Sequence, residues 1–335
     1  MKHHRWPLIL LCALALLVTS AAAERRPLKV MVLYDMEGVS GATDERHTNY
    51  AHPAEYAEGR KSLTADVNAA IAGLKAAGAT EIVVVDGHGS GNTTGPDVLE
   101  DQLLPPARVH YQDTPFDIYM DSYDASFDAI VAVAMHAGAG NRVGFLSHTD
   151  SAEDVEYTVN GVPFNESMIL ATGAARLKIP LIMVSGDDQL EKEIHRNMPW
   201  VEYAAGKHAV DRVRAESFPR EEVSRRIEAA ARRALEKLDQ AKLPDWPGPY
   251  RFALTFQDEE QARNAALLAG AELLRNGRSV QIRSQDFEEG YRRSLRLIGL
   301  AEHVGWMTAF QAVIDGEPNA AQLRVKVGDR LNDRW

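Results

Sequence analysis

The stretch LKVMVLYDMEG (residues 28–38) joins a short apolar run to two acidic residues and a glycine. The run is rich in β-forming residues, which predicts a buried strand over residues 28–34. Strands that alternate with helices predict an α/β fold, with a mostly parallel sheet and helices on both of its faces. Similar apolar runs follow at residues 81–85, 129–134 and 180–184, and helical patterns lie at residues 53–77, 166–177 and 219–238.

A proline-rich segment at residues 243–249 marks a change in organisation, because three prolines within six residues cannot continue a helix. The patterns after it predict a strand over 250–256, a helix over 259–276, a strand over 279–283 and a helix from Asp286. These elements form a smaller C-terminal α+β unit. We therefore predict a signal peptide (residues 1–23), an α/β metal-binding catalytic domain (24–243) and a smaller α+β domain (249–335).

The first residues have the pattern of a secretory signal peptide. Basic residues lie within positions 2–5, an apolar run spans 8–18, and three alanines at 21–23 offer a cleavage site near Ala23. The run is short for a membrane span, and an uncleaved anchor is the alternative interpretation. We expect a periplasmic or secreted protein with no membrane contact after cleavage.

The composition limits both the classes of binding partner and the residue types that can serve as metal ligands. A formal net charge of −11 at pH 7 argues against a nucleic-acid partner and against an anionic membrane surface. The one cysteine, Cys12, lies inside the predicted signal peptide. Any metal site of the mature chain therefore has to use His, Asp and Glu.

Potential metal ligands follow three successive predicted strands. Asp35 and Glu37 come after the first strand, His88 after the second and His136 after the third. The carboxyl ends of parallel strands meet at one edge, where open α/β sheets place their sites. Each residue taken alone is more commonly a helix cap or a solvated loop residue. Their coincidence favours a Zn²⁺ or Mn²⁺ site with open coordination positions.

An ordered set of motifs resembles one known family. The motifs are DMEGVSG (35–41), VDGHG (85–89), AMHAG (134–138), GFLSHT (144–149), VNGVPFNE (159–166) and PLIMVSGDD (180–188), with a weaker likeness at VQIRSQDF (280–287). In this order they resemble the D-aminopeptidase family, metallopeptidase family M55. The resemblance covers nearly the whole predicted mature chain.

The resemblance implies a zinc-dependent aminopeptidase that hydrolyses N-terminal amino acids, of the D configuration by the family's name, from short peptides or amides. It also implies two Zn²⁺ ions per chain, with Asp35 as the bridging carboxylate. The implied metal ligands are Asp35, Glu37, His88, His136 and Glu166. Glu166 also opens the predicted helix before the fourth strand, near the same edge of the sheet.

His148 matches the family's catalytic histidine. A water activated by the two metals would attack the scissile carbonyl, so on chemical grounds we expect His148 to transfer a proton or to stabilise the oxyanion rather than to act as the nucleophile. The family forms large assemblies, so the resemblance also implies a homo-oligomer. The family's activity implies short peptides as substrates. Asn165 stands where the family commonly has glycine, which leaves the substrate preference open.

Two other functions are compatible with these residues. One is another two-metal hydrolase such as a phosphoesterase, although Arg142 is the only basic residue near the ligand motifs that could hold a phosphate. The other is a non-catalytic exported metal- or peptide-binding protein, because retained ligands do not prove turnover. Three questions stay open at this point: whether the substrate has the D or the L configuration, whether the metal is zinc or manganese, and which ligand binds which metal ion.

Overall fold

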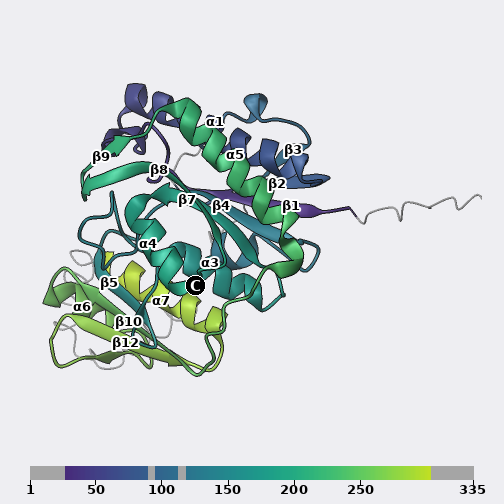
Figure 1. Cartoon of the computed structure of the whole chain (residues 1–335). Helices are drawn as coiled ribbons and strands as arrows, with labels where there is room; N and C mark the ends of the chain where they lie inside the picture. Colours follow the sequence, from purple (N-terminus) through teal and green to yellow (C-terminus); the bar gives the residue numbers. More distant parts are fainter. Residues whose placement is uncertain (1–26, 90–94, 112–117, 303–335) are drawn as a thin grey trace, which may run out of the picture.

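The computed structural model describes residues 27–89, 95–111 and 118–302 (Figure 1). The predicted signal peptide and residues 303–335 of the predicted second domain lie outside the described residues. Among the described helices, none is both long and apolar enough to cross a membrane.

A seven-stranded sheet forms the centre of the molecule, in the order β3-β2-β1-β4-β7-β8-β9. All neighbours pair in parallel except the last two strands, β8 and β9. The four strands predicted before the proline-rich segment are confirmed as β1, β2, β4 and β7, and the mostly parallel α/β sheet is confirmed with them. The strands are β1 (Lys29–Tyr34), β2 (Glu81–Asp86), β3 (Ala107–His110), β4 (Ala129–Met135), β7 (Leu181–Asp187), β8 (Glu202–Asp211) and β9 (Arg214–Ser217).

Helices cover both faces of this sheet, as the sequence predicts (Figure 1). One face packs against α1 (Pro53–Ala76) and α5 (Arg220–Glu236), and the other against α3 (Glu166–Ala175) and α4 (Asp188–Asn197). Successive side chains of a strand point to opposite faces. Accordingly Val30 and Val32 pack in the core with α1 and α5, whereas Met31 and Leu33 pack in the core on the other face. Burial on both faces explains why these strands are continuous apolar runs.

A second, antiparallel sheet lies beside the first, in the order β11-β12-β10-β5-β6. Two of its strands precede the proline-rich segment, and β5 pairs directly with β10 across it. The predicted strands over 250–256 and 279–283 and the helix after Asp286 are confirmed. The elements are β5 (Asp154–Val159), β6 (Val162–Pro163), β10 (Tyr250–Phe256), α6 (Glu259–Ala265), β11 (Glu272–Leu273), β12 (Ser279–Ser284) and α7 (Phe287–Glu302).

The helix predicted over residues 259–276 is wrong in its second half. It ends as α6 at Ala265, and Glu272 and Leu273 form β11 instead. Gly270 has a φ of +74°, in the left-handed region that an α-helix cannot contain. Pairing of β11 with β12 then satisfies the backbone of this edge, a long-range interaction that overrides local helix propensity.

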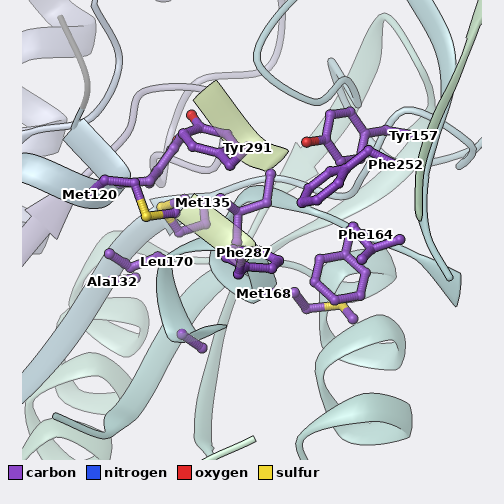
Figure 2. Close-up of a cluster of buried hydrophobic side chains, with 14 of the residues drawn as sticks. Met120, Ala132, Met135, Tyr157, Phe164, Met168, Leu170, Phe252, Phe287 and Tyr291 are labelled. Atoms are coloured by element: carbon purple, nitrogen blue, oxygen red, sulfur yellow. The ribbon is translucent and has the colours of Figure 1, made fainter. Parts of the chain in front are cut away.

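Aromatic side chains join β10 of the second sheet to α7 and to Phe164, which lies two residues before α3 (Figure 2). The ring centroids of Phe252 and Phe287 lie 5.5 Å apart, and those of Phe164 and Phe287 lie 6.3 Å apart. These rings belong to the same continuous core as Met135 and Met168. The second sheet, α3 and α7 therefore share one continuous hydrophobic core with this face of the central sheet. This core supports the loops at the carboxyl edge of the central sheet.

Candidate metal centre

The order of the central sheet reverses between β1 and β4. The chain runs outward from β1 through β2 to β3 on one side, and from β4 through β7 to β8 on the other. In open α/β sheets such a switch point leaves a crevice at the carboxyl ends of the strands, where ligands bind. Asp35 and Glu37 follow β1 here, and His136 follows β4. The fold therefore brings together residues that lie about a hundred positions apart.

Close backbone approach at this point requires glycine. A Cβ atom at Gly38 would lie 2.0 Å from the carbonyl oxygen of Met135, and one at Gly186 would lie 2.2 Å from the same oxygen. The loop after β1 and the last residues of β7 thus lie against the end of β4 on both sides, which explains the glycines of DMEG and SGD. Ala134, at the same place, has a φ of +62°, in the left-handed region that is costly for residues other than glycine.

The structure brings all six sequence-predicted side chains into one group. The Nε2 atom of His136 lies 3.2 Å from Oδ2 of Asp35 and 3.1 Å from Oε2 of Glu166. The Nε2 atom of His88 lies 3.5 Å from Oε1 of Glu37. The sixth residue, His148, lies at the open side of the group.

His148 stacks on His136, with ring centroids 4.0 Å apart and an angle of 14° between the planes. Its Nε2 atom lies 3.8 Å from Oε1 of Glu166, and its side chain keeps 23% of its surface exposed while that of His136 keeps 1%. His148 is therefore the imidazole of the group that a substrate can reach.

Hydrogen bonds fix the same tautomer in all three imidazoles. The Nδ1–H of His136 donates to the carbonyl of Ala137 at 3.0 Å, and that of His148 donates to the carbonyl of Leu146 at 2.8 Å. The Nδ1–H of His88 donates to a carboxylate, that of Asp97, at 2.9 Å. Each ring therefore presents Nε2 to the carboxylate group, which is the orientation that metal-binding histidines adopt.

The electrostatics of the group demand a positive charge. Burial raises the pKa of Asp35 well above its usual range, and the charge of Glu37 adds to this effect. Burial also opposes the charged forms of Glu166 and His136, but their mutual attraction outweighs it. It lowers the pKa of Glu166 to about 2 and raises that of His136 well above its usual range. Without a cation, the protonated imidazole takes the place that a metal ion would fill.

The donor atoms fit a metal ion. Two buried atoms, Oε2 of Glu37 and Nε2 of His136, have no hydrogen-bond partner among the described residues, which is costly unless another group satisfies them. Two overlapping sets each bring three donor atoms within 4.8 Å of one another: Asp35, Glu37 and His136, and His136, His148 and Glu166. Carboxylate and imidazole donors without thiolates suit Zn²⁺ or Mn²⁺.

Three residues of the centre were missed in the sequence. The hydroxyl of Tyr119, in α2 (Ile118–Asp121), donates to Oε2 of Glu166 at 2.6 Å. Asp97 binds His88, as described above. Lys207 of β8 is fully buried, and its Nζ donates to the carbonyl oxygens of Glu37 and Ala42 at 2.8 Å each. None stands in a recognisable motif, and each reaches the site only through the tertiary fold.

Lys207 also bears on the chemistry of the centre. Burial lowers its pKa to about 7, and its ammonium group is committed to backbone carbonyls rather than to the open side of the site. Arg142, the basic residue that the sequence placed near the motifs, is exposed. Neither side chain is arranged as a phosphate clamp.

Comparison with known proteins shows the family to which the chain belongs. A family model described as D-aminopeptidase matches residues 28–295. The chain is 28% identical to a D-aminopeptidase of Bacillus subtilis (strain 168) over 275 residues. This alignment covers 82% of this chain and 98% of the Bacillus protein. A solved structure titled "Zn-dependent D-aminopeptidase DppA from Bacillus subtilis, a self-compartmentalizing protease" superposes with a TM-score of 0.76 at 28% identity, over 82% of this chain and 98% of the other. The chain thus belongs to the D-aminopeptidase family, peptidase family M55, and is a metallo-aminopeptidase.

Proposed function

We propose that this protein is a zinc-dependent aminopeptidase that releases N-terminal amino acids, of the D configuration, from short peptides or amides. The observation that carries the proposal is the convergence of Asp35, Glu37, His136 and Glu166 at the switch point of the sheet. Two buried donor atoms of this group, Oε2 of Glu37 and Nε2 of His136, have no hydrogen-bond partner in the part of the chain that the structure describes. The similar Bacillus protein is described as a Zn-dependent D-aminopeptidase, which supports the choice of zinc as the metal and of D-amino acids as the substrate class.

We further propose that each chain holds two zinc ions. Asp35 would be shared, Glu37 and His88 would hold one ion, and His136 and Glu166 the other. The contact of His88 with Glu37 and that of His136 with Glu166 support this division. Asp35 lies within reach of both Glu37 and His136, which supports its shared position. When zinc is bound there, it lowers the pKa of a water molecule and polarises the scissile carbonyl.

His148 is the proton-transfer residue in this proposal. Burial and the charge of His136 lower its pKa, so that the ring is neutral at physiological pH. Because Nδ1–H is held by the carbonyl of Leu146, the lone pair on Nε2 faces the group. It can accept a proton from the attacking water and deliver it to the leaving amine. Detection of a covalent acyl-imidazole on His148 would instead assign it the role of nucleophile.

The test is made on the mature chain that begins at Glu24. Bound metal is measured by elemental analysis, and hydrolysis of paired D- and L-alanyl amides is followed before and after chelation. About two zinc ions per chain, with chelator-sensitive release from the D-amide alone, is the expected result. Metal without turnover would favour a binding protein, and cleavage of a chromogenic phosphoester alone would favour a phosphoesterase. A chain that bound no metal and gained no activity from zinc or manganese would overturn the proposal.

Two histidine variants sharpen this test. His148→Ala should abolish most of the hydrolysis while both zinc ions stay bound. His208→Ala is the matched control, since His208 also binds a neighbouring carboxylate, that of Asp188, but lies exposed outside the site. Equal activities of the two variants would contradict the role given to His148.

We also propose that the protein is exported and forms a homo-oligomer. The signal-like pattern at residues 1–23 supports export, and the self-compartmentalising nature of the similar Bacillus protein supports assembly. N-terminal sequencing of the exported protein tests the cleavage after Ala23. Light scattering on the purified chain tests the assembly, and a monomer at working concentration would contradict it.

A further inference from the structure

We propose that Asp97 is a positioning residue that fixes His88 for metal binding, and that Tyr56 and Arg60 of α1 hold Asp97 in place for this task. The inference rests on the proposed function only through the metal ion, because it concerns how a ligand is oriented and not which substrate is cleaved.

The imidazole of His88 is held between two carboxylates. Its Nδ1–H donates to Oδ2 of Asp97 at 2.9 Å, and its Nε2 faces Oε1 of Glu37 at 3.5 Å. With the proton on Nδ1, the lone pair of Nε2 points at an anionic oxygen, which is repulsive unless a cation lies between them. The arrangement is therefore stable with a metal ion, or with a second proton, at Nε2. This is the carboxylate–histidine–metal arrangement in which an outer carboxylate orients the ligand.

His88 differs in this respect from the other two histidines of the centre. His136 and His148 donate Nδ1–H to backbone carbonyls, whereas His88 donates to a carboxylate. A charged acceptor makes a stronger hydrogen bond and raises the basicity of the opposite nitrogen. The metal position that includes His88 should consequently depend on one side chain, that of Asp97, and the other position should not.

Asp97 is itself held at both carboxylate oxygens. It is completely buried, and while Oδ2 accepts from His88, Oδ1 accepts a short hydrogen bond from the hydroxyl of Tyr56. Its backbone N–H donates to the hydroxyl of Tyr34, at the end of β1, at 2.9 Å. The carboxylate cannot rotate without losing one of these partners, so the direction in which it receives Nδ1–H is determined by the core.

Arg60 fixes the backbone that carries this carboxylate. Its Nε donates to the carbonyl of Asp97 at 2.7 Å, and its Nη2 donates to those of Pro96 at 3.0 Å and Val98 at 3.3 Å. Tyr56 and Arg60 are four residues apart on α1, so they lie on the same side of the helix. One turn of α1 thus clamps both the side chain and the main chain of Asp97. Arg60 alone would suffice to anchor the backbone of residues 96–98. The additional bond from Tyr56 acts on the carboxylate of Asp97 and so fixes its orientation.

The experiment compares three variants: Asp97→Ala, Asp97→Asn and, as a matched control, Asp66→Asn. Asp66 is an equally buried carboxylate that accepts hydrogen bonds from Ser40 and has no hydrogen bond to a histidine of the described chain. Zinc binding is titrated against a competing chelator, and the Nδ1–H proton of His88 is followed by NMR, where a hydrogen bond to a carboxylate shifts it far downfield. No substrate is used in either measurement.

In Asp97→Ala, one zinc position should weaken on the order of 10- to 100-fold while the other keeps its affinity, and the downfield proton should vanish. Asp97→Asn keeps an oxygen acceptor, so the proton should persist at a smaller shift and zinc should weaken less. Asp66→Asn should leave both readouts unchanged. If a folded Asp97→Ala chain bound both zinc ions with wild-type affinity, or if Asp66→Asn weakened zinc equally, the inference would be overturned.

Failure of the proposed function is distinguishable from failure of this inference. A wild-type chain with two zinc ions and no hydrolysis would remove the proposed activity, and the Asp97 variants would still be judged by their zinc titrations. A wild-type chain without the downfield His88 proton would contradict the role of Asp97 whatever the chain hydrolyses.

Discussion

Replacing Gly38 by alanine should damage the metal centre. The new Cβ would lie 2.0 Å from the carbonyl oxygen of Met135 and 2.4 Å from the carbonyl carbon of Ala134. Real Cβ atoms essentially never come within 3.0 Å of such atoms, so the two backbones have to separate by about 1 Å. Both clashing atoms belong to a buried strand and not to a flexible side chain, so relief by a rotamer change is excluded.

The displacement falls between two implied metal ligands. Gly38 directly follows Glu37, and Met135 directly precedes His136. Metal–ligand distances tolerate deviations of about 0.2 Å, so a 1 Å separation exceeds that tolerance about fivefold. We expect Gly38→Ala to lose about 3 kcal/mol or more of unfolding free energy and at least half of its bound zinc.

The assay pairs denaturant unfolding with elemental analysis of the purified protein. Gly140→Ala is the control, because an added Cβ there meets nothing within 4 Å and its stability should change by no more than about 0.5 kcal/mol. A Gly38→Ala chain that matched Gly140→Ala in both unfolding free energy and zinc content would refute the reasoning.

Three further outcomes are expected. Lys178 closes α3 with a φ of +63° and is exposed, so Lys178→Gly should raise the unfolding free energy by about 1 kcal/mol in denaturant melts; a loss would contradict the strain argument. Burial lowers the pKa of Lys207 to about 7 from an ordinary 10.5. Between these values the unfolded chain binds a proton at Lys207 that the folded chain lacks. The unfolding free energy of the wild type relative to that of Lys207→Met should therefore rise by about 1.4 kcal/mol per pH unit in urea melts of both chains made between pH 7 and 10 in chelator. Chelation should lower the thermal midpoint reversibly, by the equivalent of about 4 kcal/mol when free zinc had stood 1,000-fold above its Kd, because zinc that binds the folded chain and not the unfolded chain stabilises the fold; an unchanged midpoint would exclude a metal-stabilised site.

The sequence by itself determined the elements that depend on local pattern. The apolar runs that became β1, β2, β4 and β7 were recognisable because a strand buried on both faces has to be continuously apolar. Asp35, Glu37, His88 and His136 were recognisable because each follows such a strand in a segment that contains glycine. Glu166 was identified from the family resemblance, with added support from its place at the start of a predicted helix. Local pattern was misleading for residues 266–276, where pairing of β11 with β12 outweighed helix propensity.

Only the tertiary structure decided which strands are neighbours and which side chains meet. Periodicity tells which face of a strand is buried, but it carries no information about the partner across a hydrogen-bonded ladder, so neither the switch point between β1 and β4 nor the pairing of β5 with β10 could be foreseen. The same holds for Asp97 and Lys207, whose neighbours in sequence give no sign of metal chemistry. Their roles arise from contacts with residues far along the chain, because a buried polar group has to find its partner in space rather than in sequence.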